Sequence, residues 1–305
     1  MHAVTPPIPR SAPVVVLAHV HYPDIWNEFA ERLAERMDVP FRLVVTTSTQ
    51  AAELRRPATS FLQAMDVLPV ENRGRDILPF LRALADIGDF DIGLKLHTKK
   101  SPQRTDGSAW RAQLYDTLLP PEGGVSDLVA RMRADRRIGL VAPDGFSLSV
   151  RPWVFVNAEP MTTVMSILGH ELVDADLDDA FFAAGSMFWF RKPALAALAD
   201  PALPSVFEAE EGQLDGTIAH AIERLFAVET RRRGLITTTI GALAASRPDQ
   251  SSEDLLALAR AHADVPNVYF PAPGVSSGGP PASPQSRPRT RLRRLLSMIR
   301  TGIRR

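Results

Sequence analysis

Hydrophobic and polar positions along the first half of the chain change repeatedly between two patterns. Short runs of β-branched and other apolar residues predict buried strands over residues 14–20, 41–46, 66–70, 92–96 and 138–142. Between these runs, apolar residues recur every three or four positions, which predicts helices over residues 26–37, 77–87, 110–119 and 125–135. Strands that alternate with helices indicate a mainly parallel sheet flanked by helices, the architecture of an α/β protein.

The second half of the chain has weaker patterns. They predict strands over 186–191 and 234–240 and helices over 217–226 and 253–262. Residues 271–286 are rich in proline, glycine and serine, which is typical of a flexible linker, and leucines and isoleucines then alternate with arginines at helical spacing. The predicted organisation is a disordered start, one α/β domain, a flexible linker and a basic amphipathic tail, at residues 1–12, 13–270, 271–286 and 287–305.

Composition narrows the class of protein. Hydrophobic residues make up 45% of the chain and charged residues 23%, which are ordinary values for a globular domain. The chain has no cysteine, which excludes disulfides, thiolate zinc sites and a cysteine nucleophile. Proline and arginine interrupt the amino-terminal segment where a signal peptide needs apolar residues, and no stretch approaches the roughly 18 apolar residues of a membrane helix. We therefore expect a cytoplasmic protein, soluble or peripheral at the inner membrane face.

The charge of the chain is unevenly distributed. The net charge is zero, but the last nineteen residues hold eight arginines and no acidic residue, so residues 1 to 286 carry a net charge of −8. An acidic body is poorly suited to nucleic acid, and we expect no nucleic acid partner. The basic tail at residues 287–305 suits an anionic membrane surface.

One candidate binding segment lies between the third predicted strand and the helix that follows. It reads Glu71-Asn72-Arg73-Gly74-Arg75-Asp76. In open parallel sheets, ligands bind at the carboxyl ends of the strands, and helix amino termini favour phosphate. Gly74 would let the backbone approach a ligand, Arg73 and Arg75 would pair with phosphate, and Asn72 would contact a sugar or base. The alternative is a structural turn, in which Asp76 caps the helix and Gly74 supplies a positive φ.

A second candidate segment ends the fourth predicted strand and reads Lys95-Leu96-His97-Thr98-Lys99-Lys100-Ser101. Its cations would stabilise a diphosphate leaving group, and His19, after the first strand, lies at the same edge. The alternative is an exposed basic loop. The two candidate loops are expected to leave neighbouring strands at one edge of the sheet. The triplet Asp89-Phe90-Asp91 spells a metal-binding motif, but it precedes its strand and is expected at the opposite edge.

Two later segments are candidates for an acceptor site and a general base. An aromatic run around Gly185, Ser186 and Trp189 suits a sugar ring, although such runs more often form core. Near Asp215, Thr217 is expected to cap a helix on which His220 and Glu223 share one face. A carboxylate there is either the base that deprotonates an acceptor hydroxyl or half of a surface ion pair.

Taken together, these motifs resemble the rhamnan synthesis F family of polysaccharide glycosyltransferases. The resemblance rests on several segments in the same order, among them 71–76, 95–101, Gly107-Ser108-Ala109-Trp110-Arg111, 185–189 and 215–224. It implies a GT-A-like fold and transfer of a sugar, L-rhamnose from dTDP-rhamnose, to a glycan or lipid-linked acceptor with inversion. A non-catalytic sugar- or nucleotide-binding component of a polysaccharide assembly complex is the alternative.

The resemblance also suggests roles for the candidate residues. The donor would contact His19, Asn72, Arg73, Gly74, Arg75, Lys95, His97, Lys99 and Lys100. The acceptor would contact Gly185, Ser186, Trp189 and His220, and the candidate bases are Asp215, Glu223 and Asp76, in that order. Metal dependence stays open: Mg²⁺ or Mn²⁺ would assist the leaving group, or lysines and arginines would replace the ion.

Overall fold

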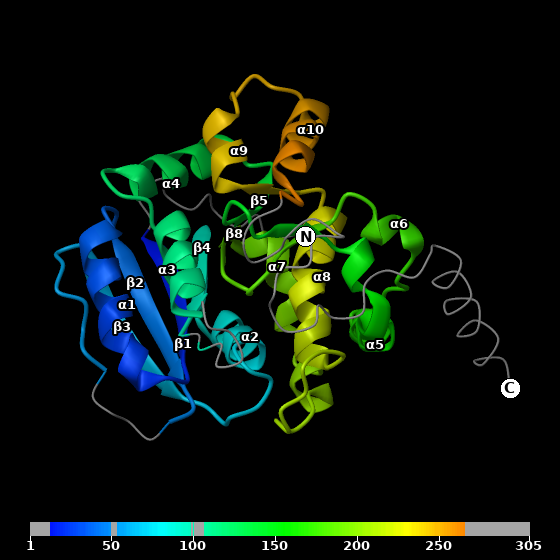
Figure 1. The fold of residues 1–305 in the computed structure, drawn as a ribbon, viewed down its shortest axis with the longest axis horizontal. Helices are drawn as coiled ribbons and strands as arrows, with labels where there is room; N and C mark the ends of the chain where they lie inside the picture. Colours follow the sequence, from blue (N-terminus) through cyan, green and yellow to red (C-terminus); the bar gives the residue numbers. More distant parts are fainter. Residues whose placement is uncertain (1–12, 50–53, 99, 101–106, 266–305) are drawn as a thin grey trace, which may run out of the picture.

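The computed structural model describes residues 13–49, 54–98, 100 and 107–265. Within them, the main element is a seven-stranded sheet of order β3-β2-β1-β4-β8-β5-β9 (Figure 1). Its strands are β1 Val14–Val20, β2 Phe41–Thr47, β3 Leu62–Pro69, β4 Ile92–His97, β5 Ile138–Ala142, β8 Phe188–Arg191 and β9 Ile236–Thr239. A small second sheet pairs β6 Ser147–Ser149 with β7 Phe181–Ala183.

The mainly parallel sheet predicted from the sequence is confirmed. Strands β1 to β4 pair in parallel, as do β5 and β9. The exception is β8, which runs antiparallel between β4 and β5. Because β8 runs the opposite way, the turn that precedes it lies at the carboxyl ends of its neighbours β4 and β5. This turn is Ala184 to Met187, so the topology brings it to the edge where ligands bind in parallel sheets.

Helices cover both faces of the sheet. One face packs against α1 Pro23–Arg36, α3 Gly107–Leu118, α4 Gly124–Ala134, α9 Ile240–Ala245 and α10 Ser252–His262. The other packs against α2 Ile77–Asp86, α5 Ala158–Ile167, α6 Asp174–Leu177, α7 Lys192–Leu195 and α8 Ile218–Arg232, with 3₁₀ turns at η1 Arg151–Trp153, η2 Phe155–Asn157, η3 Ala196–Ala199 and η4 Leu203–Val206. Figure 1 shows α1 and α3 on one side of the strands and α8 crossing the centre of the molecule.

Alternation along the strands decides which face each side chain joins. In β1, Val14 and Val16 pack with the α1 and α3 face, whereas Val15 and Leu17 pack with the α2 and α8 face. The same alternation in β4 sends Leu94 and Leu96 to the first face. Every second residue of these strands therefore belongs to the α2 and α8 face, and the polar residues at the strand ends follow this rule.

Most predicted elements agree with the structure, but several bounds and one neighbour relation differ. Helix α8 ends at Arg232, six residues after its predicted end. Strand β3 begins at Leu62, four residues before the predicted start at Asp66. The segments 71–76 and 95–101 do not leave neighbouring strands, because β2 and β1 lie between β3 and β4. The segment 71–76 runs from the end of β3 to the start of α2. There Asp76 contacts Lys95 of β4. The predicted linker 271–286 and tail 287–305 lie outside the described residues.

Gly93 in β4 provides a test of the packing on the α2 and α8 face. A Cβ atom added there would lie 2.5 Å from the ring of Phe190 and 3.0 Å from that of Phe90. We expect Gly93→Ala to lower the free energy of unfolding by about 1 to 3 kcal/mol, because the buried Phe190 ring must move. Urea denaturation measures this loss, and an unchanged midpoint would contradict the packing described.

Candidate functional site

A buried ammonium group lies at the carboxyl edge of the sheet. The side chain of Lys95 is only 1% exposed, and its Nζ contacts the rings of Phe80, Phe188 and Phe226 at 5.3 to 5.9 Å from their centroids. The ammonium donates to Asp76 Oδ2, to Ser186 O at 2.7 Å and to Ser186 Oγ at 2.8 Å. An ammonium has three protons, so these three bonds use all of them. The predicted contact of Lys95 with the donor is therefore corrected: Lys95 holds Asp76 and the 184–187 turn instead.

Asp76 stays ionised although it is largely buried. Burial alone would raise the pKa of its carboxyl group, but the nearby His97 and Lys95 and the hydrogen bond from Lys95 hold this pKa well below its ordinary value. Burial lowers the pKa of Lys95, and Asp76 opposes that shift. Asp76 is the residue before the first turn of α2, yet its side chain makes no capping hydrogen bond. The capped-turn interpretation is therefore wrong for Asp76, while Gly74 does take the positive φ of 66° that this interpretation predicts.

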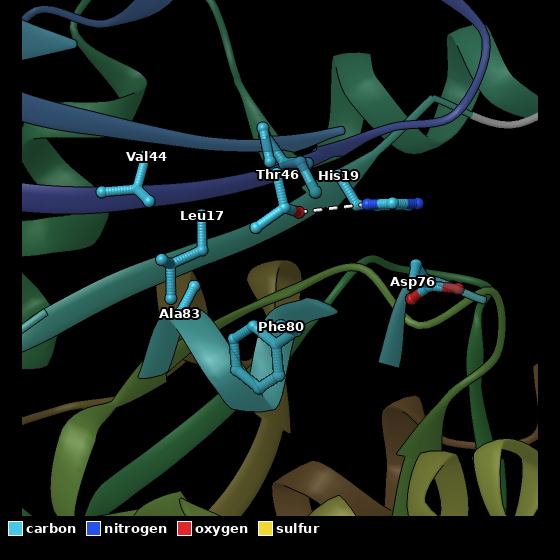
Figure 2. A pocket seen from close by; sticks show the side chains of 9 residues that line it. Leu17, His19, Val44, Thr46, Asp76, Phe80 and Ala83 are labelled. Carbon is cyan, nitrogen blue, oxygen red and sulfur yellow. Dashed lines mark hydrogen bonds between the residues drawn. The ribbon is translucent and has the colours of Figure 1, made fainter. Parts of the chain in front are cut away.

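Two histidines lie side by side on the α2 and α8 face. The parallel register pairs His19 of β1 with His97 of β4 and with Thr46 of β2. His19 Nδ1 lies 3.0 Å from Thr46 Oγ1, and Figure 2 shows this contact and Asp76 facing the His19 ring across a small cavity. The cavity measures about 10 Å³, which is room for one water molecule. Burial lowers the pKa of His19 to about 4, so this ring is neutral at pH 7.

The larger cavity of this edge measures about 330 Å³ and is lined by both polar and apolar residues. The polar and glycine residues are Arg75, Asp76, His97, Gly185, Ser186, Asp215, His220, Glu223 and Arg224. The apolar residues are Ile77, Trp110, Leu148, Trp153, Phe182, Ala184, Leu214 and Ala219. Carboxylates can accept hydrogen bonds from hydroxyls and aromatic rings can pack on C–H groups, so this lining suits a sugar. Residues from all four candidate segments thus meet in one place.

The three candidate bases differ in how firmly they are held. Glu223 accepts from Gly185 N at 3.0 Å and from Arg224 at 2.7 Å, and Asp76 accepts from Lys95. Asp215 lies 3.6 Å from Arg224 and 3.9 Å from His220, which is beyond hydrogen-bonding distance, and its side chain is 32% exposed. Its Oδ1 has no hydrogen-bond partner among the described residues. Asp215 is therefore the carboxylate with the weakest contacts to the rest of the protein.

His220 is neutral and is held by Thr217. Its Nδ1 lies 2.8 Å from the Thr217 hydroxyl oxygen and 3.4 Å from the Thr217 backbone nitrogen. Burial and the nearby Arg75 lower the pKa of His220 to about 4, against the opposing charge of Asp215. The Thr217 hydroxyl accepts from the His220 backbone N–H, so the predicted cap of α8 is confirmed. His97 Nε2 donates to the carbonyl oxygen of Gly185 at 2.9 Å.

The remaining donor-site predictions have different outcomes. Arg73 donates to the Phe207 carbonyl oxygen, and the Phe207 ring fills the space beside Gly74. Arg73 and Gly74 are not among the described residues that line the larger cavity. Arg75 lines the cavity but is bonded to the loop around Glu210. Asn72 is exposed. Lys100 is paired with Asp24 at 2.6 Å, and Lys99 lies outside the described residues.

Trp189 corrects the predicted acceptor site. Its side chain is fully buried with the α1 and α3 face, and its Nε1 donates to Leu118 O at 2.8 Å. Alternation in β8 places Trp189 on the face opposite Phe188, which rules out contact with a ligand in the cavity. The aromatic residues that do line the cavity include Trp153 and Phe182. Phe182 belongs to the aromatic run that surrounds Gly185 in the sequence, whereas no spacing signal marks Trp153.

In the described parts of the chain, no group of three or more histidine, aspartate and glutamate residues is placed to hold a metal ion. Asp76 is bonded to Lys95. Asp89 and Asp91 lie at the amino end of β4, as predicted, where they pair with Lys192 and Arg191.

Comparisons with known proteins agree with the motifs. The family model for rhamnan synthesis protein F matches residues 4–233. The chain is 38% identical over 229 residues to the uncharacterized protein WxcX of Xanthomonas campestris pv. campestris strain B100, and equally to that of strain ATCC 33913. The match covers 74% of this chain and 32% of each relative, so the chain spans about a third of their length.

Among solved structures, the crystal structure of S. aureus TarS 1-349 matches with a TM-score of 0.38 and 11% identity, over 71% of this chain and 55% of that chain. The family match over residues 4–233 includes strands β1 to β8 and the candidate site from His19 to Arg224. The chain belongs to the rhamnan synthesis protein F family.

Proposed function

We propose that this chain is a glycosyltransferase of surface-polysaccharide synthesis, which transfers L-rhamnose from dTDP-rhamnose to a glycan or lipid-linked acceptor. The observation that carries the proposal is the 330 Å³ cavity at the carboxyl edge of the sheet, which is lined by three carboxylates together with apolar and aromatic side chains. Family membership supports the same activity. The sheet order and the site at the carboxyl edge fit a GT-A-like fold.

In the proposed reaction, Asp215 accepts the proton of an acceptor hydroxyl. The hydroxyl oxygen attacks the anomeric carbon of the donor, and the bond from this carbon to the diphosphate oxygen breaks, so the configuration inverts. The diphosphate leaves with the bonding electron pair. Asp215 suits the role of base because its carboxylate makes only long contacts with Arg224 and His220.

A non-catalytic sugar- or nucleotide-binding component of a polysaccharide assembly complex is the second candidate. The observation in its favour is that Lys95, Arg75 and Arg224 all have carboxylate or carbonyl partners within the protein. A donor diphosphate would have to displace one of these partners or bind cations elsewhere. This candidate predicts binding of a saccharide without release of nucleotide diphosphate.

Thermal shift against a panel of nucleotide sugars tests the proposal. We expect dTDP-rhamnose to raise the melting temperature most, because a ligand at about 100 times its dissociation constant adds roughly 2.7 kcal/mol of stability. The panel is run with EDTA, Mg²⁺ or Mn²⁺ to decide whether binding needs an ion. The assay then measures release of dTDP with and without a saccharide acceptor.

Three outcomes of this panel separate the candidates. Stabilisation with release of dTDP supports the enzyme. Stabilisation without release of dTDP supports the binding component. A panel in which no nucleotide sugar shifts the transition would count against the donor class as a whole.

The proposal also covers how the domain reaches a lipid-linked acceptor. Among the described residues, no helix has both the length and the apolar character needed to cross a bilayer. Residues 287–305 would instead bring the domain to a lipid-linked acceptor by binding the anionic inner face of the membrane through their arginines.

A further inference from the structure

Two arginines expected to bind donor phosphate hold a loop of the protein instead. The loop runs from Phe207 to Gly216, called here the 207–216 loop, and it carries Asp215 into the cavity. We propose that Arg73 and Arg75 are positioning residues that set the location of Asp215 through this loop. The inference rests on the proposed function, because it assigns a role in the same reaction.

Arg73 holds the beginning of the loop. Its guanidinium donates from Nε to Phe207 O at 2.9 Å and from a second nitrogen to the same oxygen. Its backbone forms an isolated antiparallel bridge with Ala209. The neighbouring Gly74 has no side chain, and this lets the Phe207 ring pack where a Cβ would lie only 2.5 Å away. Both the side chain and the backbone of Arg73 therefore bind the 207–216 loop.

Arg75 holds the middle of the loop. Its backbone N–H donates to Glu210 Oε1 at 3.0 Å, and its guanidinium donates to Gln213 O and lies 3.8 Å from Glu210 Oε2. Arg75 has a left-handed backbone with φ of 54°, which costs energy for a residue with a side chain. The contacts with Glu210 and Gln213 offset this cost. They also place the next residues of the loop, Leu214 and Asp215, at the cavity.

The loop depends on these contacts because it has little apolar packing of its own. Between Phe207 and Thr217, every residue is exposed or only partly buried, and Leu214 is 87% exposed. The other polar anchors lie at its ends, where Glu208 accepts from Ile218 N and Asn157 accepts from Gly216 N. Without the arginines, the middle of the loop would lose its attachment to the 71–76 segment, and Asp215 would lose its fixed place beside Arg224.

Hydrogen exchange tests the first part of this inference. We expect Arg73→Ala to speed exchange of the backbone amides of residues 208–216, measured by mass spectrometry on the full chain. Arg73→Lys should do the same, because one ammonium cannot reproduce the two guanidinium bonds to one carbonyl. Arg82→Ala is the control, since Arg82 pairs with Glu71 at the start of the 71–76 segment and not with the 207–216 loop. Unchanged exchange in the Arg73 variants would overturn the inference.

A double-mutant cycle between Arg75 and Glu210 tests the second part. If Arg75 acts through the loop, Arg75→Ala and Glu210→Ala should each lower kcat, on the order of 100-fold for a base displaced by about 1 Å. The double variant should lose no more than either single variant, and the KM for the donor should change little.

The opposite pattern identifies a donor contact. If Arg75→Ala raises the donor KM while Glu210→Ala leaves both constants unchanged, Arg75 binds phosphate and the positioning role is wrong. Should no nucleotide sugar be turned over, the proposed function fails, but the exchange experiment still decides whether the two arginines hold the loop.

Discussion

Replacing Asp215 with asparagine is expected to lower the kcat of sugar transfer by about 100- to 10,000-fold, the usual contribution of a general base. Asparagine keeps the size of the side chain but cannot accept the hydroxyl proton. Donor binding should be retained, because Asp215 is not required to hold the diphosphate. The measurement compares initial rates of dTDP release with saturating acceptor and the thermal shift produced by the donor.

Asp174→Asn is the matched control for this variant. Asp174 also pairs with an arginine, Arg151 at 3.4 Å, but it lies on α6 away from the cavity-lining residues. We expect the Asp174→Asn variant to keep the kcat of the wild type. If Asp215→Asn keeps more than half of its kcat while Glu223→Gln loses it, the base is Glu223, and the contacts of Glu223 with Gly185 and Arg224 must open during the reaction.

Replacing Lys95 with methionine is expected to lower the free energy of unfolding by about 3 to 5 kcal/mol, the cost of leaving a buried charge without its partner. Methionine fills most of the volume and can contact the surrounding rings of Phe80, Phe188 and Phe226. What it cannot replace are the hydrogen bonds to Asp76 and Ser186. Urea denaturation at pH 7 measures the loss.

The pair of Lys95 and Asp76 predicts a pH dependence. The folded-state pKa of Asp76 lies below its unfolded value, so its contribution to stability is complete above about pH 4 and is lost as the pH falls toward the folded pKa. The difference in stability between the wild type and Asp76→Asn should therefore shrink below about pH 4. Adding Asp76→Asn to Lys95→Met should recover part of the loss, because no buried charge is left unpaired. Equal losses at all pH values, or strictly additive losses, would contradict an ionised pair.

The order of strands and helices was readable from the sequence because each element carries its own period. The runs at Val14–Val20 and Ile92–His97 have enough β-branched and apolar residues to mark buried strands, and α2 has a clear apolar face. The start of β3 was missed because residues 62 to 65, Leu-Gln-Ala-Met, contain no β-branched or aromatic residue, so their strand signal is weak. The antiparallel direction of β8 has no signature within its four residues.

Part of the site could also be predicted. All seven of the following candidates line the cavity: Asp76, His97, Gly185, Ser186, Asp215, His220 and Glu223. The roles of the cations could not be predicted, because an arginine in a loop has the same local sequence whether it binds phosphate or a carbonyl. The partners of Arg73 lie 134 and more positions away in the chain, at Phe207 and Ala209.

The chain by itself determined the α/β class, the family and the edge of the sheet where chemistry is placed, since these follow from short-range periodicity and from motifs of a few residues. Only the tertiary structure decided what each side chain of that edge contacts. Alternation along β8 sent Trp189 to the opposite face, and burial turned Lys95 from an expected ligand contact into the internal partner of Asp76. The physical reason is that hydrogen bonds and ion pairs form between groups that are close in space, and folding brings those groups together from distant parts of the chain.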